Sequence, residues 1–170
     1  MIVAGQVIEP GEKRRIPIPV GEGLSLETVC FCGRRPGRTL VVTSGVHGCE
    51  YVGVETLTHL SEELDPEEMS GSLILLPLAN PEGFYEGVKR VVPEDGKNLN
   101  RAFPGDKAGS ISAQMAYAIE TYLYPAADFL ADLHGGDCCE ALTPLVFFPV
   151  AGGKKVNDKA LTAARELTVP

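Results

Sequence analysis

Short apolar runs alternate with amphipathic segments along most of the chain, and the two patterns predict different elements. Apolar runs rich in β-branched and aromatic residues predict five strands, over residues 27–32, 39–46, 72–78, 128–134 and 145–150. Apolar residues at helical spacing predict helices over residues 50–64, from Ser110 to a stop at Pro125, and over 157–167. This order of strands and helices is that of an α/β domain.

The run over residues 39–46 is apolar at nearly every position, as in strands that are covered on both faces. We therefore expect this strand at the centre of the sheet, with helices packed on each side. The predicted fold class is a three-layer α/β/α domain with a mixed, largely parallel sheet. A chain of 170 residues is near the usual size of one domain, so a single domain over residues 1–170 is expected.

A long segment without helical or strand periodicity covers residues 83–109, after a turn at residues 80–83. It is rich in Gly, Pro and charge. Irregular loops of this length inside compact domains are usually functional, so the segment is a candidate part of a binding site.

The net charge disfavours two classes of partner. Fifteen Lys and Arg against 23 Asp and Glu give a net charge of -8, which repels nucleic acid and anionic membrane surfaces. The chain has no apolar stretch of the roughly 18 residues that a membrane helix needs, and its first 15 residues do not resemble a signal peptide. Five cysteines, an odd number, are expected to be reduced thiols, which fits a cytoplasmic location.

Candidate metal ligands follow two of the predicted strands. His47 and Glu50 come after the strand over residues 39–46, and their spacing puts both side chains on one side of a single helical turn. His134 ends the strand over residues 128–134, and open α/β sheets bind ligands at the carboxyl ends of strands. If these strands are neighbours, the three side chains, here called the ligand trio, converge.

Two imidazoles and a carboxylate with an open fourth position are a ligand set of catalytic zinc, whose bound water loses a proton near neutral pH. We therefore expect one zinc ion per chain, although the same ligands also suit Mn, Co or Fe. The simpler interpretation is a polar residue at each strand end, because a lone His-x-x-Glu pattern often occurs by chance. His59 lies within a predicted helix and is expected at the surface.

Arg90, Asn100 and Arg101 lie in the long loop and suit an anionic substrate, because an arginine fork binds a carboxylate with two hydrogen bonds. The alternative is that these charges are solvated or paired with Glu94 and Asp95. The pattern alone leaves both interpretations open.

Four segments of the chain stand out together. They are Gly45-Val-His-Gly-Cys-Glu50, Asn80-Pro-Glu-Gly83, Asp95-Gly-Lys-Asn-Leu-Asn-Arg-Ala-Phe-Pro-Gly105 and Asp132-Leu-His-Gly135. In this order they resemble the succinylglutamate desuccinylase and aspartoacylase family, a branch of the zinc carboxypeptidase clan. The resemblance covers about half of the chain and implies a zinc carboxypeptidase-like (phosphorylase/hydrolase-like) fold.

Carried over by position, the resemblance implies that the ligand trio binds zinc and that Asn100 and Arg101 hold the free carboxylate of the substrate. Arg90 resembles the arginine that polarises the scissile carbonyl. The implied reaction is hydrolysis of an amide bond by metal-activated water, of the deacylase or desuccinylase type. The implied substrate is a small N-acyl amino acid or a short peptide with a free carboxylate. The oligomeric state stays open, with a homo-oligomer among the outcomes.

The chain departs from the family pattern at two points. Zinc carboxypeptidases have an Asp two residues before the Asn-Arg pair, whereas this sequence has Asn98. An amide at this position can accept a hydrogen bond from His47 but adds no negative charge, so we expect a less basic ligand. The general base of the family, a downstream strand glutamate, has no match in Glu140 or Glu166.

We therefore expect the N-terminal part of a zinc-hydrolase domain, truncated before the downstream strands, the general base and the C-terminal β-rich domain of the family. Such a chain should bind zinc and be weakly active or inactive. A metallocarboxypeptidase or a peptidoglycan-peptide amidase of the same clan would share the trio, and a non-catalytic metal-binding module would keep the trio without the base. A thiol hydrolase would instead use Cys49, with its pKa lowered at a helix N-terminus, and His47 as base.

Overall fold

The structure is a computed structural model that describes residues 1–21, 23–167 and 169. The chain divides into two compact units, Met1–Cys139 and Glu140–Pro170. That both units belong to one domain stays a prediction. Among the described residues, none of the helices is long and apolar enough to cross a membrane.

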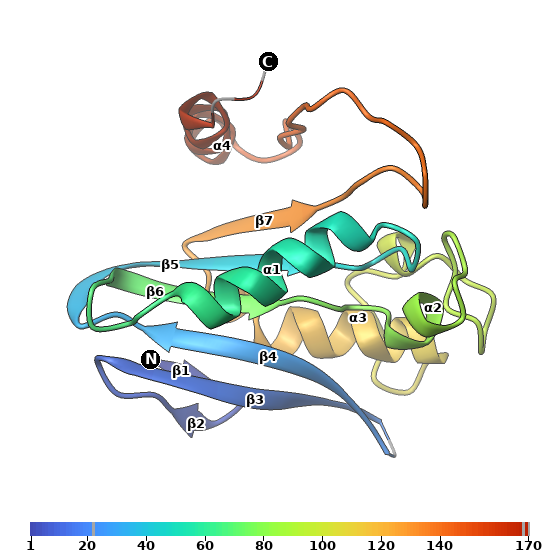
Figure 1. Cartoon of the computed structure of the whole chain (residues 1–170), viewed down its shortest axis with the longest axis horizontal. Helices are drawn as coiled ribbons and strands as arrows, with labels where there is room; N and C mark the ends of the chain where they lie inside the picture. Colours follow the sequence, from blue (N-terminus) through green and yellow to red (C-terminus); the bar gives the residue numbers. More distant parts are fainter. Residues whose placement is uncertain (22, 168, 170) are drawn as a thin grey trace. The chain divides into compact units, whose positions relative to one another are not determined.

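The first unit is built on a five-stranded sheet with the strand order β3-β4-β6-β5-β7 (Figure 1). The strands are β3 (Glu12–Gly21), β4 (Leu24–Cys32), β5 (Arg35–Ser44), β6 (Ser70–Leu76) and β7 (Phe129–Leu133). Strand β5 is parallel to both of its neighbours, β6 and β7, whereas β4 is antiparallel to β3 and β6. The sheet is therefore mixed, as predicted, with parallel pairing on the side that carries the ligand trio. A separate two-stranded ladder joins β1 (Ile2–Val3) and β2 (Gln6–Val7).

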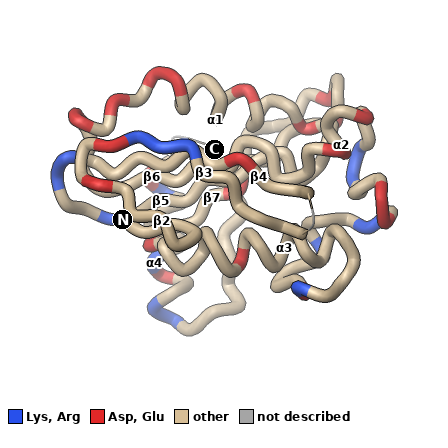
Figure 2. Tube along the Cα trace, turned by 90° about the horizontal axis from the view of Figure 1, so that it is seen from below, with Lys and Arg blue, Asp and Glu red and all other residues tan. Residues whose placement is uncertain are grey.

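Helices cover both faces of this sheet, with α1 (Tyr51–Glu63) on one side and α3 (Ile111–Tyr122) on the other (Figure 2). Alternate residues of each strand point to opposite faces and pack against different helices. Leu57 of α1 packs with Phe31 and Val42, and Met115 of α3 packs in the cluster that contains Val41. The three-layer arrangement predicted from the sequence is confirmed.

The predicted helices are found as α1, α3 and, in the second unit, α4 (Lys154–Glu166). The predicted turn at residues 80–83 is instead the start of the short helix α2 (Pro81–Tyr85), because the Asn80 side chain caps it by accepting a hydrogen bond from Gly83 N (3.0 Å). The long loop contains one short 3₁₀ helix, η1 (Leu99–Arg101), and another, η2 (Tyr124–Ala126), follows α3.

Strands β1, β2 and β3 were not predicted, and one predicted strand does not form. In β3, Pro17 and Pro19 occupy exposed positions that alternate with the buried Ile16 and Ile18, and prolines are uncommon in strands. As an edge strand, β3 tolerates prolines that a central strand would not. The strand predicted over residues 145–150 is wrong, because the described part of the second unit holds no strand to pair with, and apolar character alone forms no ladder.

Candidate metal centre

The ligand trio lies at the carboxyl ends of β5 and β7. These strands are parallel neighbours with Ser44 opposite Leu133, so the residues that follow them meet at one edge of the sheet. His134 directly follows β7, while His47 and Glu50 lie between β5 and α1. The predicted helical turn over His47 and Glu50 is wrong: α1 begins only at Tyr51, and a tight turn joins Glu50 N to the His47 carbonyl (3.2 Å).

Two glycines make this tight turn possible. Gly45 has a φ of +64°, a conformation that side-chain-bearing residues rarely adopt. At Gly48 the turn passes so close to another segment that a Cβ would lie 2.1 Å from the Gly83 carbonyl oxygen and 2.6 Å from that of Val88. The ligand-bearing turn is therefore packed directly against residues 83–88.

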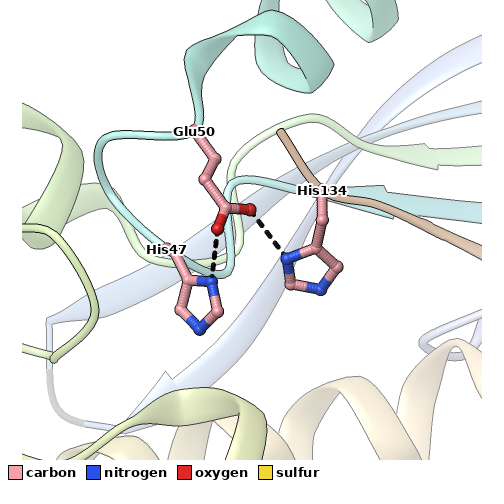
Figure 3. A group of neighbouring side chains, drawn as sticks. All are labelled: His47, Glu50 and His134. Carbon is pink, nitrogen blue, oxygen red and sulfur yellow. Dashed lines mark hydrogen bonds and ion pairs between the residues drawn. The ribbon is translucent and has the colours of Figure 1, made fainter. Parts of the chain in front are cut away.

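The Glu50 carboxylate lies between the two imidazole rings (Figure 3). Its Oε1 is 2.7 Å from His47 Nδ1 and its Oε2 is 2.7 Å from His134 Nδ1. The side chains of His47 and Glu50 are almost fully buried, and that of His134 is 34% exposed. One ligand atom from each side chain lies within 4.8 Å of those of the other two, so the trio can hold a single metal ion.

The far nitrogen of each ring has its own partner. His47 Nε2 lies 3.3 Å from Asn98 Oδ1, and His134 Nε2 lies 2.8 Å from Asp132 Oδ2. The other Asp132 oxygen accepts a hydrogen bond from the Thr43 hydroxyl of β5 (2.6 Å). Because Nε2 donates outward on each ring, Nδ1 is the nitrogen that remains to bind a cation.

Hydrogen bonding to Asp132, with a smaller contribution from Glu50, outweighs burial and raises the pKa of His134 to about 9. A cation between the three side chains would replace the Nδ1 proton of His134, because metals bind the neutral imidazole. Such a cation would therefore lower the pKa of His134. Two neutral imidazoles and one carboxylate are a donor set that fits zinc.

The segment over residues 95–101 is bound to α3 through Asp95 and to the trio through Asn98. Asn98 Oδ1 also accepts a hydrogen bond from Asn100 N (2.9 Å), so a single amide oxygen joins His47 to η1. Asp95 accepts hydrogen bonds from the Ser112 backbone N–H (3.0 Å) and hydroxyl at the start of α3. Asp95 therefore supports the start of α3, a role different from the ion pairing with the loop arginines that the sequence left open.

A hollow of about 320 Å³ shares Asp132, the hydrogen-bond partner of His134, with the surroundings of the trio, but none of the trio side chains lines it. Its wall contains Asn100 and two carboxylates, those of Asp132 and Glu120, together with apolar side chains that include Phe103 and Ile119. Its volume is at the lower end of the range for small-molecule sites. Arg101 is exposed, and its Nη1 donates to the Asn100 carbonyl (3.2 Å), so the structure brings Asn98 and Asn100 to the centre but leaves Arg101 at the surface.

Arg90 has a partner that the sequence pattern did not indicate. Its Nη2 lies 3.6 Å from Asp137 Oδ2, three residues beyond His134, and Lys89 Nζ lies 3.5 Å from the same oxygen. The arginine is therefore held near the loop that follows His134 by Asp137, and not by Glu94 or Asp95.

The thiol hydrolase interpretation loses its main support. Cys49 Sγ is buried and donates to the Gly87 carbonyl (3.2 Å). A hydrogen bond with Cys138, together with burial, raises the Cys49 pKa, whereas a nucleophilic thiol needs a lowered one.

Asp132 belongs to the motif over residues 132–135, but the motif alone does not indicate its role. The available signal was its spacing, since residues two apart on a strand point to the same side, as Asp132 and His134 do here. No comparable signal existed for Asp137, because its partners are 47 and 48 positions earlier in the chain, in a loop without periodicity.

Comparison with protein families matches residues 36–170 to the succinylglutamate desuccinylase/aspartoacylase catalytic domain. The chain belongs to this family. The match includes all three ligand candidates and the whole long loop. It therefore confirms the family resemblance of the sequence motifs.

Individual members of the family agree with this assignment. An N-alpha-acetyl-L-2,4-diaminobutyric acid deacetylase from Halomonas elongata is 33% identical over 159 residues, which is 92% of this chain and 46% of that protein. The chain thus spans about half the length of this curated relative.

Solved structures of the family have the same fold. An aspartoacylase family protein from Mesorhizobium loti matches 99% of this chain and 55% of its own, with 32% identity and a TM-score of 0.79. A succinylglutamate desuccinylase/aspartoacylase from Rhodobacter sphaeroides matches 90% of this chain and 48% of its own, with 28% identity and a TM-score of 0.76. The fold predicted from the sequence is that of the family.

Proposed function

We propose that this chain forms the metal-binding part of a zinc-dependent hydrolase that cleaves the amide bond of an N-acyl amino acid. The observation that carries the proposal is the Glu50 carboxylate set between two imidazole Nδ1 atoms, each at 2.7 Å. A buried carboxylate between two histidines at the end of a parallel sheet is a common form of catalytic zinc site.

If bound by the ligand trio, zinc would supply the chemistry of polarising a carbonyl group and lowering the pKa of a water molecule. The chain's own residues prepare the site for it. Asp132 orients His134 and adds negative charge, while Asn98 orients His47 without adding charge. The two imidazoles therefore differ in the charge of the group that Nε2 contacts, which is a carboxylate for His134 and a neutral amide for His47.

The Asn100 and Arg101 pair is proposed to hold the carboxylate of the substrate, and Arg90 to stabilise negative charge that develops on the scissile carbonyl oxygen. For Arg101 this requires its exposed side chain to turn from the Asn100 carbonyl toward the substrate. A small acyl amino acid is the proposed substrate class because the H. elongata relative is named for a substrate of this class.

Deprotonation of water requires a general base, and neither Glu140 nor Glu166 is assigned to this role. We therefore propose that the chain by itself binds zinc and substrate with little turnover. The cytoplasmic location and a homo-oligomeric state stay predictions.

Calorimetric titration of N-acetyl-L-2,4-diaminobutyrate into the zinc-loaded and the chelator-treated chain tests the proposal. We expect binding that requires zinc, and weaker binding in Arg101→Gln. Lys107→Gln, in the same loop, is the matched control and should bind as the unmodified chain does. Equal binding with and without zinc would contradict the proposal, and preferential cleavage of a peptide at its C-terminus would favour a metallocarboxypeptidase.

A further inference from the structure

Asp137 is a buried carboxylate next to the candidate centre, with only 5% of its side chain exposed. Burial of an ionised carboxylate is costly unless cations or hydrogen-bond donors compensate it. Lys89 and Arg90 supply two cations at 3.5 and 3.6 Å from the same Asp137 oxygen. Their own side chains are 64% and 67% exposed, so the buried member of the group is the anion.

The loop that carries Asp137 is tied to the ligand-bearing turn at three points. Gly135 N donates to the ligand oxygen Glu50 Oε2, Cys138 N donates to the Cys49 carbonyl, and the Tyr51 hydroxyl donates to the Cys138 carbonyl, each at 3.2 Å. Asp137 lies between these attachments. Its position is therefore set by the same turn that carries Glu50.

The segment with Lys89 and Arg90 has no regular structure of its own to orient its side chains. Its backbone does approach the centre, because Gly87 accepts a hydrogen bond from Cys49 Sγ and the Val88 carbonyl packs against Gly48. A fixed carboxylate beside two exposed, long cationic side chains restricts where their charges lie.

We propose that Asp137 is a positioning residue that holds Arg90 and Lys89 beside the metal centre, so that their charge faces the anionic group of the ligand. Two cations share one carboxylate, which leaves about one net positive charge for a carboxylate or an oxyanion. Lys89 thereby joins Arg90 in the site. The positioning role of Asp137 rests on the proposed function for the identity of the ligand, which is taken to be an acyl amide or its carboxylate product.

Acetate, a carboxylate product of deacetylation, is the probe for this charge. In calorimetric titrations of the zinc-loaded chain we expect Arg90→Gln to weaken acetate binding about tenfold, the effect of losing a charged hydrogen bond. Asp137→Asn should weaken it about fivefold although it removes no direct contact, because it acts through the cations. Zinc content should be unchanged in both variants.

The decisive comparison uses the double variant Lys89→Gln/Arg90→Gln. In that background, Asp137→Asn should have no further effect on acetate affinity. If Asp137 had only a structural role, Asp137→Asn would reduce acetate affinity equally in the unmodified background and in the Lys89→Gln/Arg90→Gln background. It would also lower the melting temperature and the zinc content. That result, or unchanged acetate affinity in Asp137→Asn, overturns the proposal.

Trypsin provides a readout that does not depend on zinc or acetate. Cleavage of the folded chain after Lys89 and Arg90 should be several-fold faster in Asp137→Asn, because the released side chains fit the protease more readily, while cleavage after Lys107 serves as the internal control. If the unmodified chain binds no acetate, the role proposed for Arg90 fails, whereas faster cleavage still supports the positioning role of Asp137. Unchanged cleavage contradicts that role.

Discussion

The ligand trio and the loop over residues 86–109 meet at one edge of the sheet, but different interactions fix them. The trio follows strands β5 and β7, whose paired backbones set the positions of His47, Glu50 and His134. The loop relies on side-chain hydrogen bonds and ion pairs, chiefly those of Asp95, Asn98 and Asp137. Backbone pairing thus places the trio residues, with Asp132 and Asn98 orienting the two rings, whereas the loop groups are positioned by side-chain contacts.

The largest effect is expected where the two regions touch. Gly48→Ala should lower the free energy of unfolding by about 3 kcal/mol, because its Cβ would overlap the backbone carbonyl of Gly83, which a hydrogen bond from Val88 N (2.9 Å) holds in place. Chemical denaturation measures the change. Gly153→Ala, where a Cβ meets nothing within 4 Å, should change stability by only a few tenths of a kcal/mol. Equal stability of the two variants would contradict this packing.

Asp132→Asn tests the side-chain contact that orients His134 at the end of β7. Loss of the carboxylate should weaken zinc binding about 10- to 100-fold, because His134 becomes less basic and less firmly oriented. Competition with a chromophoric chelator measures the affinity. Asp128→Asn, at the other end of the same predicted strand, should bind zinc as the unmodified chain does. An Asp132→Asn variant with full affinity would show that the strand alone orients the ligand.

The support of the loop is tested by Asp95→Ala. Burial alone would raise the pKa of Asp95, but hydrogen bonds from Ser112 and from Lys97 N outweigh it and lower the pKa to about 2. A folded-state pKa below the ordinary value of 3.8 means that the stabilisation is complete above about pH 4 and lost as pH falls through 2.

Asp95→Ala should therefore cost about 1 kcal/mol at pH 7, as for the loss of a helix cap, and the difference from the unmodified chain should shrink between pH 4 and 2. Thermal unfolding across this pH range measures it. Asp106→Ala, which removes only an exposed turn hydrogen bond to Ala108 N, is the control. A difference that does not depend on pH would argue against the ionised carboxylate as its source.

The smallest effect is expected at the junction between loop and trio. Asn98→Asp keeps an oxygen near His47 Nε2 and adds a negative charge, so zinc affinity should rise about twofold to fivefold. The same chelator competition detects this. Weaker zinc binding in Asn98→Asp would mean that His47 needs the neutral amide of Asn98, and that a negative charge at this position does not improve zinc binding.

The strand-end region was predictable from the sequence because its signals are local. An apolar run followed by Gly45, and a His at the end of another run, place three ligands once the strands are parallel neighbours. The pairing itself is non-local, and so are the contacts of Asp132 with Thr43 and of Asp137 with Arg90. Strand β3 was not predicted because it contains prolines, which are uncommon in strands. The apolar run at 145–150 forms no strand, and the described part of its unit contains no strand for it to pair with.

The central claim is that the ligand trio binds one zinc ion. Equilibrium dialysis against zinc, followed by elemental analysis, tests it with Glu50→Ala and, as the matched control, His59→Ala, whose ring is exposed and pairs with Glu55 on α1. The unmodified chain and His59→Ala should each hold about one zinc per chain, and Glu50→Ala should hold almost none. Full zinc occupancy in Glu50→Ala, or none in the unmodified chain, would contradict the claim.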